Sequence, residues 1–181
     1  MKRRVIFPDP EIWTRKATMT QYADHPRAAD ARRASAITIH HRQQNRDGLV
    51  ALVLETCEAG RPTELLLALL AIHRTAILQL RSDVGLQFVG RYVKQLAAGA
   101  GQLDDNDKAA DIARSARLLD AHAREDVEAI SATVRAAVDA GRPTELVIRL
   151  LDLYEVLLPE LSSEPGINWL RGCVSLYAAE E

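Results

Sequence analysis

The residues whose types could do chemistry in this chain are five histidines, two cysteines and a short acidic cluster. His40 and His41 are adjacent, and because neighbours in a helix point to different faces they do not form a metal clamp. The sequence contains no H-E-x-x-H, G-x-G-x-x-G, G-x-x-x-x-G-K, G-x-S-x-G or C-x-x-C motif. We therefore expect no cofactor and no metal, and we predict that the protein is not an enzyme.

The remaining chemical candidates have plain structural interpretations. The acidic run 104–107 lacks the glycine and the later glutamate of a calcium-binding loop, so it is predicted to be a linker that caps the next helix. His73 lies in an apolar stretch and is predicted to be a hydrogen-bonded core residue. Cys57 and Cys173 are predicted to be buried free thiols in a reducing environment, which favours a cytoplasmic location.

Segment 27–46 is rich in basic and amide side chains, which can track phosphates and contact base edges when they share one helix face. Its basic residues are Arg27, Arg32, Arg33, His40, His41, Arg42 and Arg46. The whole chain has a net charge of −2, and no aromatic residue is interleaved with these basic groups. A solvated outer helix is the favoured interpretation; binding of nucleic acid or of an acidic protein remains open.

The composition excludes several classes of protein. The chain has 181 residues, of which 48% are hydrophobic, 27% are charged and only 4% are aromatic, so neither a disordered tail protein nor a sandwich of many short strands is expected. No apolar run of roughly 18 residues was identified, and we expect no membrane contact. The basic start is followed by too few apolar residues for an export signal. Four Lys against nineteen Arg favour a bacterial or phage origin.

The chain contains an internal repeat with an offset of 81 residues. The segment A-G-R-P-T-E-L at 59–65 recurs at 140–146, and the ungapped alignment has 22 identities in about 74 positions. We call residues 26–99 copy 1 and residues 107–180 copy 2. Positions that differ by 81 are called equivalent below. This repeat predicts a tandem duplication.

Each copy is predicted to form four helices, which gives an all-α fold of about eight helices in two four-helix units with pseudo-two-fold or solenoid-like packing. The expected helices of copy 1 are 26–45, 49–59 and 62–80, followed by a fourth that Ser82 or Asp83 caps and in which Leu86, Val89, Val93 and Leu96 form one buried stripe. In copy 2 the expected helices are 107–120, 122–140, 143–158 and 165–179. The predicted domains are an arm at 1–25, a repeat unit at 26–99, a linker at 100–106 and a repeat unit at 107–181. Within this scheme Gly48 is expected to end the first helix.

The repeated A-G-R-P-T-E-L segment is predicted to be a helix stop followed by a helix start. Gly60 supplies a left-handed residue, Pro62 suits a first helical position, and Glu64 meets the positive end of the helix dipole. A corner of this kind does not require arginine. Arg61 and Arg142 are therefore candidates for a matched pair of exposed basic groups.

The two copies differ in charge and in apolar content. Copy 1 has ten basic and six acidic residues, a net charge of +4, whereas copy 2 has eight basic and thirteen acidic residues, a net charge of −5. Leu54, Ala68 and Ala71 of copy 1 are equivalent to Arg135, Arg149 and Asp152 of copy 2. We expect the arm, a second subunit or a protein partner to cover the extra apolar surface of copy 1.

The arm carries Phe7, Ile12, Trp13, Met19 and Tyr22 between prolines and charged residues. We predict that it packs on copy 1, either in cis or in trans. The favoured function is a non-enzymatic interaction or adaptor protein that binds a protein partner, or a second copy of itself, through the apolar and basic surface of copy 1. The candidate contact residues are the seven basic residues of 27–46 together with Leu54, Arg61 and Arg142. A nucleic-acid-binding regulator is the alternative, and an uncharacterised enzyme is third.

Overall fold

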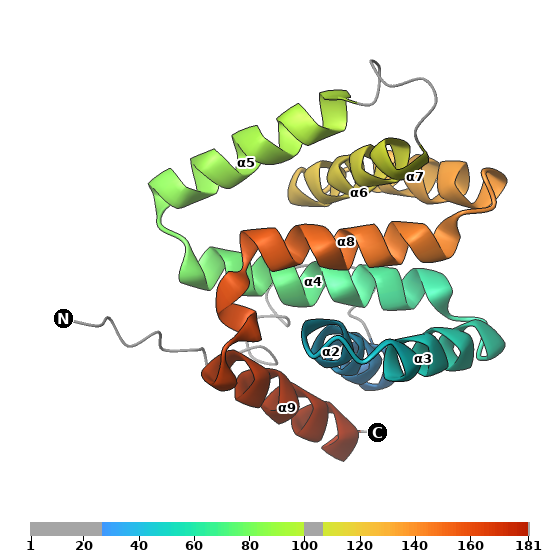
Figure 1. The fold of residues 1–181 in the computed structure, drawn as a ribbon, viewed down its shortest axis with the longest axis vertical. Helices are drawn as coiled ribbons and strands as arrows, with labels where there is room; N and C mark the ends of the chain where they lie inside the picture. Colours follow the sequence, from blue (N-terminus) through green and yellow to red (C-terminus); the bar gives the residue numbers. More distant parts are fainter. Residues whose placement is uncertain (1–26, 100–106, 181) are drawn as a thin grey trace. The chain divides into compact units, whose positions relative to one another are not determined.

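The computed structural model describes residues 27–99 and 107–180, and within these ranges the fold is entirely helical, as the sequence predicts. Figure 1 shows the helices in chain order. They are α2 (Ala28–Arg42), α3 (Arg46–Glu58), α4 (Pro62–Leu80), α5 (Asp83–Ala98), α6 (Asp107–Ala123), α7 (Val127–Asp139), α8 (Pro143–Leu157), the 3₁₀ turn η2 (Pro159–Ser162) and α9 (Glu164–Ala179). The predicted arm lies outside the described residues.

The helices form two compact units. Unit 1 contains α2, α3, α4, η2 and α9, and unit 2 contains α5, α6, α7 and α8. These units are not the two predicted domains 26–99 and 107–181, because the fourth helix of each copy packs on the first helix of the other copy. In unit 1 α9 packs on α2, and in unit 2 α5 packs on α6.

Helix α2 belongs to the core of unit 1, so the prediction of a solvated outer helix is wrong. Ala31, Ala34 and Ile37 are buried. The alanine side chains are short, which lets α4 and α9 pack closely on α2. Ser35 and Thr38 are also buried, and their hydroxyls donate to the carbonyls of Ala31 and Ala34 at 3.0 and 2.8 Å. A hydroxyl that bonds within its own helix can be buried at little cost. The low hydropathy of this segment therefore did not predict its burial.

The break after α2 does not lie at Gly48. Gln44 adopts the left-handed conformation with φ 55°, and the Asn45 N–H donates to the carbonyl of His40 at 2.9 Å. The Asn45 side chain then accepts from the Gly48 N–H at 3.0 Å and caps α3. Gly48 is thus in the first turn of α3. An added Cβ there would overlap the ring of His40, so Gly48 permits close packing of α2 on α3.

In copy 2 the first helix ends three residues later than the sequence predicts. Helix α6 continues to Ala123, and Glu125 takes the left-handed conformation with φ 60°. Asp126 then caps α7 by accepting from the Ala129 N–H at 2.9 Å. The predicted helix start at His122 is therefore wrong. In both copies the left-handed residue at this break is not a glycine but Gln44 or Glu125, which the sequence did not indicate.

The A-G-R-P-T-E-L corners form as predicted. Gly60 and Gly141 have φ values of 67° and 69°. The Arg61 N–H donates to the carbonyl of Thr56 at 3.0 Å, and the Arg142 N–H donates to the carbonyl of Ala137 at 2.9 Å. This pattern closes the preceding helix in a Schellman motif, in which only glycine adopts the required conformation without strain.

Helix α4 packs on α2 and α3 within unit 1. It is the one described helix that is long and apolar enough to cross a membrane, a property that the sequence reading did not identify. Its buried residues include Leu65, Leu66, Ala68, Leu69, Leu70, Ile72, His73, Ala76 and Ile77. Burial of this face explains its apolar composition, since the core helix of a globular domain meets the same criterion.

Candidate protein-interaction surface

The basic residues of α2 do not form one open face. Arg27 and Arg46 are exposed, Arg32, Arg33, His40 and His41 are half-buried, and Arg42 is buried. The Arg33 Nε donates to Glu55 at 3.0 Å, and the Arg42 Nη1 donates to the Ser162 hydroxyl at 3.1 Å. These contacts hold basic groups within unit 1. Of the seven basic residues, only Arg27 and Arg46, at the two ends of the segment, are exposed.

Arg61 holds a buried carboxylate and is not available as an exposed basic group. Its Nη2 and Nε lie 2.7 and 3.0 Å from the Asp30 carboxylate, which has no exposed surface. The hydrogen bond to Asp30 is the main cause that raises the pKa of Arg61. A buried carboxylate needs such a bidentate partner, which explains why the corner carries arginine. Arg33 adds a longer contact to Asp30 at 3.6 Å.

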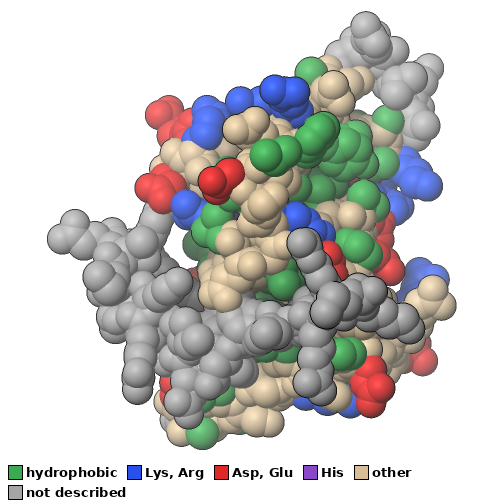
Figure 2. Space-filling model, turned by 90° about the vertical axis from the view of Figure 1, so that its left-hand side faces the viewer, with side chains coloured by type: hydrophobic (Ala, Val, Ile, Leu, Met, Phe, Trp, Pro, Cys, Tyr) green, Lys and Arg blue, Asp and Glu red, His purple; other side chains and the backbone are tan. Residues whose placement is uncertain are grey.

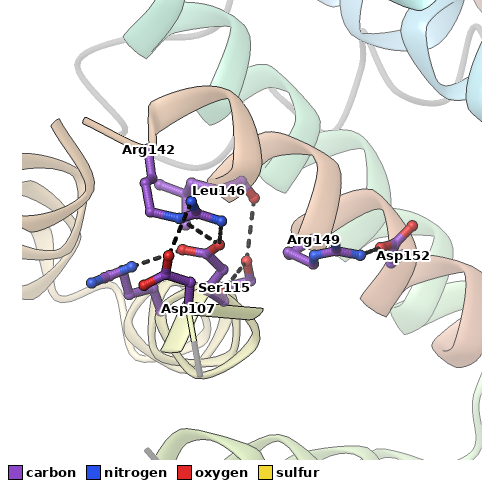
Figure 3. A network of polar contacts seen from close by, with 8 residues as sticks. Asp107, Ser115, Arg142, Leu146, Arg149 and Asp152 are labelled. Atoms are coloured by element: carbon purple, nitrogen blue, oxygen red, sulfur yellow. Dashed lines mark hydrogen bonds and ion pairs between the residues drawn. The ribbon is translucent and has the colours of Figure 1, made fainter. Parts of the chain in front are cut away.

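Unit 2 contains the equivalent pair (Figure 3). Arg142 Nη2 and Nε donate to Asp111 Oδ2 at 2.6 and 2.8 Å, and this hydrogen bond is the main cause that raises the pKa of Arg142. Arg114 also donates to Asp111 at 2.7 Å, while the Ser115 hydroxyl joins the network through the carbonyl of Leu146 at 3.2 Å. Arg61 and Arg142 are therefore structural residues in both units. Sequence reasoning singled out both arginines but missed this role, because each aspartate partner lies 31 residues earlier in the chain.

His73 and its equivalent Tyr154 are both completely buried. The Nδ1 of His73 lies 2.8 Å from the carbonyl of Leu69, in agreement with the predicted hydrogen-bonded core residue. Burial lowers the pKa of His73 to about 3, opposed by the Leu69 hydrogen bond and assisted by the charges of Arg42 and His41. Burial raises the pKa of the Tyr154 hydroxyl. Both side chains are therefore neutral at pH 7.

The two cysteines are free, as predicted, but only one of them is buried. Cys173 lies inside unit 1, where burial raises its pKa to about 12. Cys57 is exposed on α3, so the prediction of two buried thiols is wrong for this residue. The described residues contain no group of three or more His, Cys, Asp or Glu side chains that could hold a metal ion.

Helix α3 presents an exposed apolar stripe that includes the predicted contact residue Leu54. Val50 and Leu54 are exposed, and Cys57 lies one turn further along the same face. The equivalents of Val50 and Leu54 on α7 are Ser131 and Arg135, so the corresponding face of α7 is more polar. We call Val50, Leu54 and Cys57 the α3 stripe.

Helix α5 presents a second exposed apolar face. Val84, Phe88 and Tyr92 follow one another at intervals of four residues and so lie on one side of the helix. All three are exposed, and 66% of the Phe88 surface is accessible. Figure 2 shows hydrophobic side chains gathered at the height of α5 and α6 in Figure 1. We call these three residues the α5 stripe.

The equivalent face of α9 is buried. Trp169 and Cys173, the equivalents of Phe88 and Tyr92, are 6% and 1% exposed. The turn η2 packs on the start of α9, where Gly166 lies so close to the carbonyl of Glu160 and the backbone of Leu161 that a Cβ would overlap them. Among the described residues of unit 2, no such turn packs on α5.

A proline distinguishes the sequence before α9 from the sequence before α5. Pro159 follows α8, so that helix ends at Leu157 and the chain folds into η2, with Leu158 and Leu161 fully buried. The equivalent of Pro159 is Leu78, and α4 continues as helix to Leu80. Copy 1 therefore has no turn that corresponds to η2.

The α5 stripe was not among the predicted site residues. The sequence predicted an inward stripe of Leu86, Val89, Val93 and Leu96, and in the structure Val93 is buried while the other three are half-buried. The sequence nevertheless contains a signal for this stripe. Residues 84, 88 and 92 form a second apolar series on the helix, and a helix that packs on one side needs only one such series. Periodicity alone could not tell which of the two series faces the core.

The fold and its surface define an all-helical protein of two compact units with an apolar helix face exposed in each. The chain matches no family model, and the comparisons with curated proteins and with solved structures gave no match either.

Proposed function

We propose that this protein is a non-enzymatic interaction protein of the cytoplasm that binds a protein partner through the α5 stripe. The observation that carries the proposal is the exposure of Phe88, at 66%, where the equivalent Trp169 is 6% exposed. A row of three large apolar residues in water is unfavourable, and such rows typically mark contact surfaces. Phe and Tyr are also among the residues that contribute most to protein interfaces.

A basic residue beside the α5 stripe favours a partner with an acidic rim. Arg91 is exposed and lies about one helical turn after Phe88. Charged residues around an apolar contact steer association and select partners more than they add affinity. The seven basic residues of segment 27–46 do not share an open face, which favours a protein partner over nucleic acid.

We also infer that copies 1 and 2 arose by duplication and that their fourth helices exchanged places between the two compact units. Support comes from equivalent positions that make equivalent contacts: the Arg61–Asp30 and Arg142–Asp111 pairs, and the caps at Ser82 and Ser163. On this account the partner supplies to α5 the cover that η2 supplies to α9.

Affinity capture from the native host, followed by mass spectrometry, tests the proposed function. The full-length protein, Phe88→Glu and Val156→Glu are compared after nuclease treatment. Val156 is a matched control because it is 63% exposed, close to the 62% of Val84, and it lies on α8 outside the stripe. We expect one protein to be captured by the wild type and by Val156→Glu but not by Phe88→Glu.

Two outcomes would contradict the proposed function. Capture that is equal for Phe88→Glu and the wild type would show that the α5 stripe is not the contact. Capture of many proteins that disappears with nuclease treatment would support the nucleic-acid alternative. Circular dichroism of each variant confirms that the helices are intact before capture.

A further inference from the structure

We propose that α5 is a releasable strap of unit 2, which undocks from α6 as one helix while α6, α7 and α8 stay folded together. The release itself does not depend on the partner proposed for the α5 stripe. Three observations carry this inference: the small buried surface of α5, the arrangement of its contacts, and the contrast with the equivalent helix α9.

Helix α5 buries little of its own surface. Among its 16 residues only Val93 is buried, and the other residues of the expected inward series, Leu86, Val89 and Leu96, are half-buried. The free energy gained by docking a helix grows with the apolar surface that it removes from water. The apolar contribution to the docking of α5 is therefore small for a helix of this length.

The contacts of α5 are concentrated on one neighbour. Among the described residues of unit 2, α5 packs mainly on α6, whereas α6 also packs on α7 and α8. Undocking of α5 therefore leaves the packing of α6 on α7 and α8 in place. An element with few buried apolar contacts opens at a lower free energy than the unit to which it belongs.

Two hydrogen bonds from arginines to carbonyls hold the ends of α5. The Nε of Arg117 on α6 donates to the carbonyl of Ala97 at 3.2 Å, and this bond is exposed. The Nη2 of Arg81, next to the cap Ser82, donates to the carbonyl of Leu157 at 2.5 Å. Water can replace the exposed bond, which therefore adds only modestly to the stability of the docked helix.

Helix α9 is the matched helix that is held more firmly. It also has 16 residues and also packs on the first helix of the other copy, but five of its residues are buried. These are Gly166, Ile167, Trp169, Leu170 and Cys173. The turn η2 packs on it as well. The same place in the repeat thus carries a fixed helix in unit 1 and a releasable helix in unit 2.

Release changes the apolar surface that α5 presents. In the docked state the α5 stripe is exposed, while the inward series with Val93 lies against α6. In the undocked state both sides of the helix are accessible. Undocking is thus a way to regulate the proposed binding, and this consequence alone rests on the proposed function.

Hydrogen exchange of the full-length protein, measured by NMR without denaturant, tests the release. The protection factor of each amide is compared between the equivalent central segments 88–96 of α5 and 169–177 of α9, and with 112–120 of α6. We expect protection factors in α5 at least tenfold lower than in α9 and α6. We also expect nearly equal values along 88–96, because one opening event exposes these amides together.

A conservative variant separates release of α5 from unfolding of unit 2. Ile130 is buried on α7, which packs on α6 and α8. Ile130→Val should speed exchange in α6 about 2- to 12-fold, the usual effect of removing one buried methyl group. It should leave exchange in α5 within about 1.5-fold of the wild type, since the packing of α7 is the same whether α5 is docked or released.

Three results would overturn the proposal. One is equal protection of α5, α6 and α9. Another is protection that rises steadily from the ends of α5 to its middle, which indicates fraying and not the release of a whole helix. The third is an equal acceleration of α5 and α6 by Ile130→Val, which would mean that α5 opens only when the whole of unit 2 unfolds.

Discussion

Helices α5 and α9 occupy equivalent positions in the two copies and pack on equivalent first helices, yet the same face is exposed in α5 and buried in α9. Trp169 of α9 is buried in unit 1, and Phe88 of α5 is exposed in unit 2. In unit 1 Pro159 follows α8 and the chain turns into η2, which packs on the start of α9. Among the described residues of copy 1, α4 continues as helix at the equivalent positions and no such turn precedes α5.

The comparison also shows which shared features are structural. Both copies keep an aspartate and an arginine 31 residues apart, and in both units these side chains form an ion pair with a buried carboxylate. Identity between copies therefore marks what each unit needs for its own folding. The differences between copies mark where the surroundings differ.

The largest expected effect is on stability at the buried aromatic position. Trp169→Ala should lower the free energy of unfolding by about 3–5 kcal/mol, because it removes a large buried side chain and leaves a cavity. Phe88→Ala should change it by less than about 0.5 kcal/mol, since Phe88 is exposed. Urea unfolding of both variants measures this contrast. Equal losses would show that the α5 stripe is covered within the chain.

The second effect concerns the glycine at the start of each helix. Gly166→Ala should cost about 2 kcal/mol or more, because the added methyl overlaps the backbone of Glu160 and Leu161. At the equivalent Gly85 the nearest atoms would lie 3.4–3.5 Å away, so Gly85→Ala should be neutral or stabilising by up to about 1 kcal/mol. Thermal unfolding of both variants checks the pair. A neutral Gly166→Ala would contradict the close approach of η2 to α9.

A smaller effect is the pH dependence of stability that results from the buried His73. The pKa of His73 is lowered to about 3 in the folded protein, so between pH 6.5 and 3 the unfolded chain binds more protons than the folded one. The free energy of unfolding should therefore fall as the pH falls through this range, by up to about 1.4 kcal/mol per pH unit. His73→Gln should show a shallower fall in urea unfolding at pH 6.5, 5.5 and 4.5. An unchanged pH slope would argue against burial of a neutral His73.

The smallest effect is at the contact of α2 with α3. Gly48→Ala should cost about 1 kcal/mol instead of gaining the usual helix propensity, because the methyl group overlaps His40. Adding His40→Ala should restore stability, since the pair then matches Ala121 and Ala129 of copy 2. Thermal unfolding of the two single variants and the double variant gives the coupling between the sites. Additive effects would mean that the two side chains do not interact.

Local features of this fold could be predicted from the sequence. The left-handed Gly60 and Gly141 and the cap at Ser82 depend only on residues a few positions away, and these predictions are confirmed. The apolar periodicity likewise predicted an all-helical fold correctly. Each of these signals is contained within about one helix.

Features that depend on distant residues could not be predicted. The burial of α2 follows from close approach by α4 and α9, which small residues permit but hydropathy does not reveal. The partner of Arg61 lies 31 residues earlier, and the fourth helices pack in the unit of the other copy. The exposure of Phe88 depends on which other elements pack on α5, and the residues of α5 alone do not show this.

The most direct test of the central claim is the dissociation constant of the purified partner for the wild type, Phe88→Glu and Val156→Glu, measured by isothermal titration calorimetry. If the α5 stripe is the contact, Phe88→Glu should raise the dissociation constant at least about tenfold, because a charge replaces a side chain worth about 1.5–3 kcal/mol on burial. Val156→Glu should leave it within about twofold. Equal dissociation constants for all three proteins would contradict the account.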